Sequence, residues 1–340
     1  MSFGSVEELE ARLAEPSPRL VEDMRRVEGD VMLLGAGGKM GPSLAMLARN
    51  ALDAAGKGSQ VVAVSRFSDE AVTRRLEAAG VRVVRADLLD EAQLAALPDA
   101  PNVVYMAAMK FGTTGQEHRT WAMNTYLPGR VADRFRDARI VAFSSGNVYP
   151  LRPLTRGAPT EDDPVGPVGE YAWSVLGRER LFHYFSERYG TKVALLRLNY
   201  AVEMRYGVLV DIALAVRDGE PVDVSMGHVN VVWQGDANEV ALRALLHCEA
   251  PPRVINLTGP ETASVRQLAR RLGERLGKEP VFAGEEQESA LLNDASRAHA
   301  LFGYPSVALN TLVDWVADWV AGGGETHGKP TKFQVRTGEF

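Results

Sequence analysis

A short glycine-rich segment, Gly35-Ala36-Gly37-Gly38-Lys39-Met40-Gly41, has residue types and spacing that suit the binding of a diphosphate. It follows an apolar run typical of a strand and precedes a helix pattern, the context in which such a glycine pattern is informative. Glycines permit the tight turn, let backbone N–H groups approach a pyrophosphate, and let the helix pack on the strand with its N-terminus toward the phosphates. The segment therefore predicts a Rossmann-type site for a nicotinamide dinucleotide. The expected contacts are Gly35, Gly37, Gly38, Lys39, Met40 and Gly41.

The end of the second predicted strand bears on which dinucleotide is bound. An NAD-preferring site usually offers a carboxylate there to the ribose hydroxyls, and this sequence has Ser65 and Arg66 instead. Ser65 can hydrogen-bond a 2′-phosphate, Arg66 can pair with it, and Lys39 adds a second nearby cation. NADP is therefore the predicted cofactor. NAD is the alternative, because Arg66 is equally compatible with a solvated surface position.

Asp87, which is followed by Leu88, stands after the third predicted strand and has two interpretations. Its carboxylate is placed to accept a hydrogen bond from the adenine amino group, and it could equally cap the N-terminus of a helix. The sequence leaves both open, and Asp87 and Leu88 are predicted cofactor contacts on the first interpretation.

The elements that must position these residues are predicted strands and helices that alternate along the chain. Short apolar runs alternate with helical patterns from about residue 30 to residue 200, which is typical of repeated βαβ units with helices on both faces of a parallel sheet. The predicted fold class is α/β, a Rossmann-type doubly wound parallel sheet with a smaller C-terminal substrate lobe. The predicted strands are Asp30–Gly35, Gln60–Arg66, Val81–Ala86, Asn102–Ala107, Arg139–Ser145, Lys192–Leu198 and a seventh at Arg253–Leu257.

The chain divides into a few parts on this pattern. An N-terminal helical arm is predicted at 1–29, and the dinucleotide-binding domain at 30–200 and about 228–257. The substrate lobe takes 201–227 and 258–321, with amphipathic helices at Val265–Leu276 and Leu309–Val320. The polar C-terminal tail, 322–340, is interpreted as a mobile end, and a tail laid across the active site is the alternative.

Composition excludes several classes of function. A formal net charge of -6 and a pI near 5.7, with the charges interspersed, give no basic face for nucleic acid. No apolar run approaches the ~20 residues of a membrane span and the first ten residues lack the features of a signal peptide, so we expect a cytoplasmic protein that binds no membrane. The single cysteine, Cys248, is interpreted as structural. The histidines are scattered, so no metal site is predicted.

Several further motifs follow the later strands. They are Met106-Ala107-Ala108-Met109-Lys110, Asn124, Ser144-Ser145-Gly146-Asn147-Val148-Tyr149, Tyr171 and Asp294-Ala295-Ser296-Arg297-Ala298. With the glycine turn they resemble the extended short-chain dehydrogenase/reductase family, also called the NAD-dependent epimerase/dehydratase family, over roughly residues 30–320. The resemblance implies a homodimer through a four-helix contact that includes the Tyr171 helix. It also implies cofactor contacts at Ala107, Ala108, Lys110, Asn124 and Tyr171.

The resemblance assigns the catalytic pair to Ser145 and Tyr171. In that family a Ser or Thr four residues before the Val-Tyr tyrosine binds the reacting oxygen, and a later tyrosine transfers the proton. The pairing makes chemical sense, because a phenol of pKa ~10 beside a cationic nicotinamide is drawn toward phenolate while a hydroxyl holds the substrate oxygen.

Val175 is a departure from the family pattern Tyr-x-x-x-Lys, since the lysine is replaced by an apolar residue. That lysine lowers the tyrosine pKa by its charge, so Tyr171 is expected to be a weak base without it. Lys110 or Arg178 are candidates to supply the lost charge. A carboxylate of the loop Glu161-Asp162-Asp163 is a candidate for another base.

The substrate pocket is expected around Asn147, Asn199, Tyr200 and Arg205, with Arg205 placed to meet a substrate carboxylate. Nucleotide-sugar enzymes of the family hold a diphosphate with arginines, whereas this chain has His228 at the corresponding strand and the acidic stretch Gly284–Glu288 nearby. A small sugar, sugar acid or polyol is therefore expected rather than a nucleotide-diphosphate sugar. Dehydration is disfavoured, because Gly146 and Asn147 offer no acid after Ser145.

The sequence predicts an NAD(P)-dependent oxidoreductase or epimerase that acts on a hydroxyl-bearing carbon of a small polar substrate. Val175 keeps two alternatives open. One is a redox-inactive dinucleotide-binding protein that serves as a sensor or partner subunit, and the other is a non-redox isomerase or lyase on the same fold.

Overall fold

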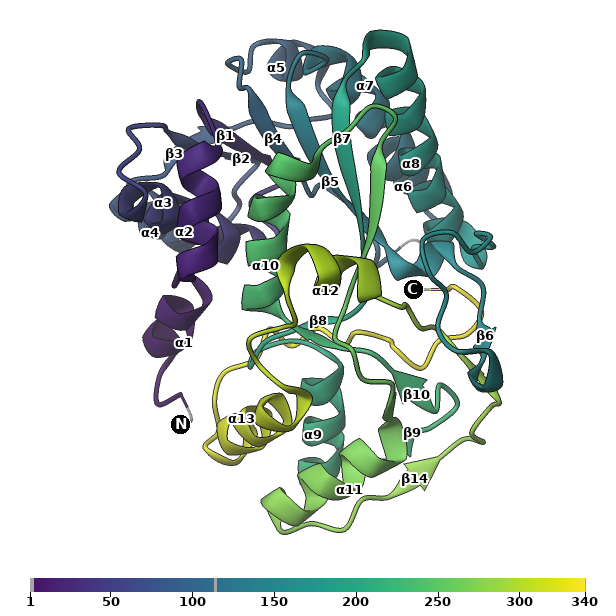
Figure 1. The fold of residues 1–340 in the computed structure, drawn as a ribbon. Helices are drawn as coiled ribbons and strands as arrows, with labels where there is room; N and C mark the ends of the chain where they lie inside the picture. The colour runs from purple at the N-terminus through teal and green to yellow at the C-terminus, as the bar shows by residue number, and fades with distance from the viewer. Residues whose placement is uncertain (1–2, 113–114, 340) are drawn as a thin grey trace.

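A seven-stranded parallel sheet lies at the centre of the computed structural model, which describes residues 3–112 and 115–339 (Figure 1). Its strand order is β12-β7-β5-β4-β1-β2-β3, and every neighbouring pair is parallel. The order reverses at β1, which confirms the doubly wound Rossmann-type sheet. The strands are β1 Val31–Leu34, β2 Val61–Ser65, β3 Arg82–Arg85, β4 Asn102–Tyr105, β5 Arg139–Ser145, β7 Lys192–Leu198 and β12 Arg253–Leu257.

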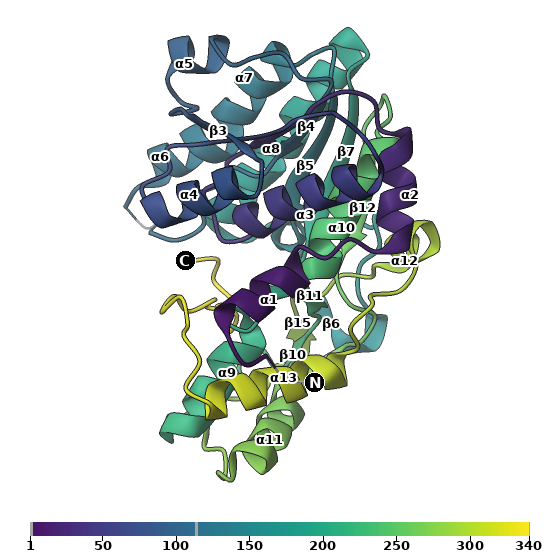
Figure 2. The same ribbon diagram turned by 90° about the vertical axis from the view of Figure 1, so that its left-hand side faces the viewer.

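Helices cover both faces of this sheet, as Figure 2 shows edge-on. Strand β1 is apolar throughout because alternate side chains enter the two different cores: Val31 and Leu33 pack on one face, and Met32 and Leu34 on the other. One face carries α2 Pro18–Arg26, α3 Gly41–Ala54 and α10 Gln234–Arg243, and the other carries α5 Glu91–Ala95, α7 Leu127–Arg134 and α8 Gly169–Tyr189.

The N-terminal arm forms two helices, as the sequence predicts. Helix α1 Val6–Leu13 begins at the Ser5 cap, and α2 begins after the Ser17 cap. Leu9 of α1 is buried in the core of the second lobe, whereas Leu20 of α2 is buried in the core of the sheet domain. The arm therefore joins the two parts of the molecule (Figure 2).

The second lobe is built on three helices that pack on one another below the sheet in Figure 1. They are α9 Val208–Asp218, α11 Val265–Leu276 and α13 Leu309–Ala321, of which the sequence predicts the last two. Between them run short two-stranded pairs, such as β8 Ala201–Val202 with β11 Val232–Trp233. No helix of the described chain is long and apolar enough to cross a membrane.

The C-terminal tail is held against the rest of the protein, so its interpretation as a mobile end is wrong. It runs from α13 back past the second lobe toward the start of α8 (Figure 1). Thr331 and Phe333 are buried, and the backbone N–H of His327 donates to the carbonyl of Arg205 at 3.0 Å. The prediction failed because the tail is polar on average, and this average does not reveal the few residues that anchor it.

Candidate active site

The glycine turn between β1 and α3 has the close approach that its sequence predicts. Gly35 has a φ of +94°, and a Cβ there would lie 2.6 Å from the backbone nitrogen of Ala107. A Cβ on Gly41 would lie 2.2 Å from the carbonyl oxygen of Ala36, so only glycine lets α3 start against the turn. This leaves the N-terminus of α3 facing the carboxyl edge of the sheet, where an anionic diphosphate is favoured.

Two cavities meet at this turn and share Gly35, Gly38, Met106 and Ala108. We name them the β2 cavity, of about 600 Å³ beside the end of β2, and the β5 cavity, of about 300 Å³ beside the end of β5. The predicted residues that line the β2 cavity are Gly37, Ser65, Arg66, Asp87, Leu88, Ala107 and Ala108. Those that line the β5 cavity are Lys39, Met40, Ala108, Lys110, Ser145, Asn147, Tyr171, Asn199 and Tyr200.

The structure excludes the helix-cap interpretation of Asp87, and its contact with adenine stays a prediction. The helix that follows, α5, is capped by Asp90, whose carboxylate accepts from the Gln93 N–H, while Asp87 accepts from the Leu89 N–H at 3.0 Å and lines the cavity. Asp69, which caps α4 Glu70–Ala78 through the Ala71 N–H, is a further cavity carboxylate that sequence reasoning missed. An aspartate directly before a predicted helix is typical of an N-cap, and this pattern could have placed Asp69 at the end of the loop after β2.

Lys39 points away from Ser65 and Arg66, which corrects its expected place beside a 2′-phosphate. Its Nζ lies 3.2 Å from the centre of the Tyr206 ring and 5.1 Å from that of Phe111, in the β5 cavity. Burial, and then the neighbouring charges of Lys329 and Lys110, lower the pKa of Lys39 to about 8. Lys39 therefore faces the reacting end of the site.

Ser145 and Tyr171 come together at the β5 cavity, from the end of β5 and the first turn of α8. The Ser145 Oγ donates to Asn147 Oδ1 at 2.9 Å and hydrogen-bonds Tyr171. Burial raises the pKa of the Tyr171 phenol, while the Arg178 guanidinium and the Ser145 hydrogen bond act in the opposite direction. The structure thus joins the predicted pair, with a phenol that needs a nearby cation to ionise.

Val175 is fully buried, and it packs in an apolar cluster with Val148, Tyr149, Tyr171 and Leu176. A lysine at this position would have its stem among these side chains. The valine therefore fills space beneath Tyr171 and brings no charge to it.

Lys110 brings a cation to Tyr171 from a different element, the loop after β4. Its Nζ lies 5.9 Å from the centre of the Tyr171 ring and 5.9 Å from that of Tyr200. Burial lowers the pKa of Lys110 to about 8, against the attraction of Asp211. Arg178 stands below, where it donates to the Phe143 carbonyl at 2.6 Å.

Asn124 lines neither cavity, so its expected role as a cofactor contact is corrected. It is fully buried in a π-helical turn, Ala122–Tyr126, and exchanges two hydrogen bonds of 2.8 Å with the backbone of Met109. It also donates to the Ser174 Oγ at 3.0 Å. Asn124 thereby fixes the loop that carries Lys110 against helix α8.

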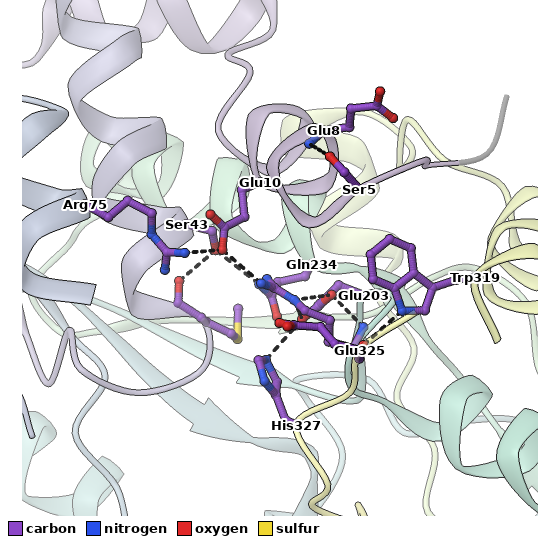
Figure 3. Close-up of polar contacts among 12 residues, drawn as sticks. Ser5, Glu8, Glu10, Ser43, Arg75, Glu203, Gln234, Trp319, Glu325 and His327 are labelled. Carbon is purple, nitrogen blue, oxygen red and sulfur yellow. Dashed lines mark hydrogen bonds and ion pairs between the residues drawn. The ribbon is translucent and has the colours of Figure 1, made fainter. Parts of the chain in front are cut away.

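Arg205 does not face the β5 cavity, and its expected role with a substrate carboxylate is wrong. Its guanidinium pairs with Glu203 at 3.0 Å and with Glu10 of the arm at 2.9 Å. Glu10 also pairs with Arg75, and Glu203 pairs with His327 of the tail, as Figure 3 shows. Arg205 is therefore a structural link between the arm, the second lobe and the tail.

The loop carboxylates before Tyr171 are engaged elsewhere as well. Glu161 accepts from the Asn256 N–H at 2.7 Å, Asp162 pairs with Arg297, and Asp163 accepts from the Thr160 N–H. None of them lines the β5 cavity. They are consequently unsuited to act as the second base.

Residues that sequence reasoning missed complete the wall of the β5 cavity. Tyr206 precedes α9, Gln234 begins α10, and Thr331 comes from the tail. The Gln234 amide donates to the Ser43 Oγ at 3.1 Å, so it bridges α10 and α3. No local pattern marked these positions, because distant contacts bring them together. The described residues contain no group of three or more His, Cys, Asp or Glu that could hold a metal.

Fold and site together define a Rossmann-type dinucleotide-binding protein with a Ser-Tyr pair at the end of its central strands. The chain belongs to the NAD dependent epimerase/dehydratase family, whose model matches residues 31–205. Membership in this family makes a nicotinamide dinucleotide the cofactor class, and the glycine turn fits its diphosphate. A comparison with curated proteins gave no significant match.

Solved structures share this fold at low sequence identity. A UDP-glucuronic acid 4-epimerase from Bacillus cereus in complex with NAD is 19% identical, with a TM-score of 0.71 over 86% of this chain and 98% of the other. A double mutant of DesIV, a dTDP-glucose 4,6-dehydratase from Streptomyces venezuelae with NAD bound, is 19% identical, with a TM-score of 0.72 over 85% and 96%. MoeE5 in complex with UDP-glucose and NAD is 22% identical, with a TM-score of 0.69 over 86% and 98%. These likenesses establish the architecture over most of the chain.

Proposed function

We propose that the protein is an NAD(P)-dependent oxidoreductase or epimerase that acts on a hydroxyl-bearing carbon of a small polar substrate. The observation that carries this proposal is the meeting of Ser145, Tyr171 and the Lys110 ammonium at one cavity beside the glycine turn. It supplies an oxygen-binding hydroxyl, a phenol and a cation to favour the phenolate.

Each residue has a definite task in this proposal. The Ser145 hydroxyl turns from Asn147 to the substrate oxygen and holds it, and the Tyr171 phenol exchanges the proton of that oxygen. Lys110 replaces the missing lysine of the family motif by stabilising the phenolate through space. When bound, the nicotinamide accepts or returns the hydride.

We also propose that the substrate is smaller than a nucleotide-diphosphate sugar, although several structurally similar proteins are described as acting on or binding such sugars. The β5 cavity has about 300 Å³, and Thr331 of the tail forms part of its wall. Beyond Asn147 the tail residues Val335 and Arg336 leave a cavity of only about 20 Å³. Arg336 is itself used inside the protein, where it donates to the Ser289 carbonyl at 2.7 Å. A sugar, sugar acid or polyol fits this space.

NADP is the proposed cofactor, with NAD as the alternative. Ser65 and Arg66 line the β2 cavity and suit a 2′-phosphate, although Lys39 does not join them. Asp69 lines the same cavity and favours NAD by offering a carboxylate.

A homodimer through α8 is the proposed assembly, because large aromatic side chains are exposed on this helix and its neighbours. Trp173 and Tyr184 of α8 are 51% and 50% exposed at a spacing that places them on one helix face. Trp121 and Tyr126, on α6 Glu117–Trp121 and the π-helical turn packed against α8, are also exposed. Such a patch is typical of an interface. Light scattering of a Trp173→Glu/Tyr184→Glu variant tests it, and we expect a monomer where the native protein is a dimer.

The test of the function is a turnover assay with the cofactor-loaded protein. Sugars, sugar acids and polyols are added, and the near-ultraviolet absorbance of reduced nicotinamide is followed together with substrate consumption. We expect turnover that Tyr171→Phe abolishes and that Tyr304→Phe, a change of an exposed tyrosine, leaves intact. Cofactor binding without any turnover supports the redox-inactive alternative, and consumption that never involves the nicotinamide supports a non-redox isomerase or lyase.

A further inference from the structure

We propose that the substrate of the β5 cavity carries a carboxylate, and that Lys39 of the glycine turn and Lys329 of the C-terminal tail bind it. This inference rests on the proposed function and narrows its substrate to hydroxy acids, of which sugar acids are the fitting class. The two lysines come from opposite ends of the chain.

The charge of the cavity wall is the first observation. Lys39 and Lys110 line the β5 cavity, and no aspartate or glutamate of the described residues lines it. Arg178, which lies behind Tyr171, adds a further buried cation that is hydrogen-bonded to carbonyl and amide oxygens. A cavity lined by cations and without carboxylates attracts anions, because its low-dielectric walls strengthen the electrostatic field of the lysines.

The position of Lys39 is the second observation. Its side chain leaves the glycine turn, and its Nζ lies 3.2 Å from the centre of the Tyr206 ring of the second lobe, in the wall of the β5 cavity. Within the described chain no carboxylate lies within ion-pair distance of its Nζ. The ammonium is thus placed to meet an anionic group of a substrate in the β5 cavity.

The tail supplies the third observation. Asp211, in the first turn of α9, accepts hydrogen bonds from the Thr331 N–H at 2.7 Å and from its hydroxyl at 2.5 Å. This contact fixes the tail where Lys329 lines a neighbouring cavity of about 340 Å³ that also contains Tyr206. Tyr206 lines both cavities, with Lys39 in the wall of the β5 cavity and Lys329 in the wall of its neighbour.

The electrostatic coupling of these groups agrees with the geometry. Lys329 is the strongest neighbouring charge on Lys39, and both it and Lys110 lower the pKa of Lys39, whereas Asp211 opposes them. Lys39 therefore has two ammonium neighbours and one carboxylate neighbour, and that carboxylate is also engaged by Thr331. A bound anion relieves this repulsion, which is the physical reason for its affinity.

Calorimetric titration of the dinucleotide-saturated protein tests the inference. The probes are D-glucuronate and D-glucose, which differ by one carboxylate, and malonate, which has carboxylates without a sugar. We expect glucuronate to bind about 10-fold or more tightly than glucose. Lys39→Met should remove most of that preference and weaken malonate similarly, Lys39→Arg should keep much of it, and Lys329→Met should weaken both acids. Lys192→Met, which removes an exposed lysine at the start of β7, should change nothing.

Three results overturn the inference: equal affinity for glucuronate and glucose, no binding of either acid, or a Lys39→Met variant that loses dinucleotide affinity and keeps acid affinity. The last result would assign Lys39 to the cofactor diphosphate. If Lys39→Met does not fold, Lys329→Met decides, because Lys329 is exposed. Turnover of neutral polyols without acid preference refutes this inference and leaves the proposed function standing. Acid binding without any turnover supports the anion site and contradicts the proposed function.

Discussion

The ammonium of Lys110 lies 5.9 Å from the centre of the Tyr171 ring, although the two residues come from the loop after β4 and from helix α8. The family motif would place a lysine one helical turn after Tyr171, where this chain has the buried Val175. Since charge acts through space, a cation from another element can also favour the phenolate. Asn124 holds the loop of Lys110 to α8 through Met109 and Ser174, so the arrangement is fixed by packing.

The first prediction concerns Lys110→Met. If Lys110 stabilises the phenolate as proposed, its removal should raise the pKa of Tyr171 further. Burial already raises this pKa, against the Arg178 guanidinium and the Ser145 hydrogen bond. We expect kcat at neutral pH to fall about 10- to 100-fold and the acidic, rising limb of the pH profile to move up by about one unit or more, because the active phenolate then forms only at higher pH. The measurement is kcat against pH on the best substrate of the turnover panel. An unchanged profile would remove Lys110 from the mechanism.

A second prediction uses Val175→Lys as a rescue. In the native background this change adds a second cation near Lys110 and places an ammonium in an apolar cluster, so we expect lower stability and no gain in rate. In the Lys110→Met background the new lysine restores the family motif, and we expect activity to recover at least in part. Val175→Met is the matched control for side-chain length. Failure of the double variant, with its fold intact by circular dichroism, would show that position 175 no longer reaches the phenol.

The sheet and the glycine turn could be predicted from the sequence because their signals are local. Apolar runs bounded by polar residues predict all seven strands of the sheet. The strands β5, β7 and β12 have the predicted bounds, and the other four differ by at most two residues at either end. The turn can be recognised because the spacing of its glycines between an apolar strand and a helix pattern is a local signal. The structure gives the reason for two of these glycines, since a Cβ would meet the backbone of Ala107 at Gly35 and of Ala36 at Gly41.

The substrate side could not be predicted in the same way, because its residues are placed by contacts between distant segments. Arg205 follows a central strand, as a pocket residue should, but Glu10 of the arm and Glu203 engage it. The direction of Lys39 depends on Tyr206, and the place of Thr331 depends on Asp211. Hydrophobic periodicity carries no information on such pairs.

A third prediction addresses the cofactor. If Arg66 binds a 2′-phosphate, Arg66→Ala should weaken NADP⁺ about 10-fold or more and leave NAD⁺ almost unchanged, since the phosphate is the only difference between them. Asp69→Asn should favour NADP⁺ by removing a negative charge from the same cavity. Fluorescence titration with both dinucleotides measures these effects. Equal losses for both cofactors in Arg66→Ala would rule out selection by this residue.

The last prediction is the pH dependence of acid binding. The pKa of Lys39 and that of Lys110 are both lowered to about 8, so these groups are ammonium ions below pH 8 and lose their protons above it. The affinity for malonate should therefore be highest below pH 8 and fall as the pH rises through about 8, in contrast to an ordinary surface lysine with a pKa near 10.4. The groups around Lys39 are Lys110, Lys329, Asp211 and Tyr206. Burial raises the pKa of the Tyr206 phenol, which stays neutral in this range.

The Asp211→Asn variant tests the direction in which the midpoint pH of malonate binding moves. The Asp211 carboxylate raises the pKa of both lysines, so its replacement by a neutral amide should move the midpoint of malonate binding to lower pH. The amide oxygen can still accept from Thr331, which keeps the tail in place. Calorimetry between pH 6 and about 9.5 follows both proteins, within the range where the two lysines titrate. A midpoint that moves up, or affinity that is flat through pH 8, would contradict the assignment of the anion to these lysines.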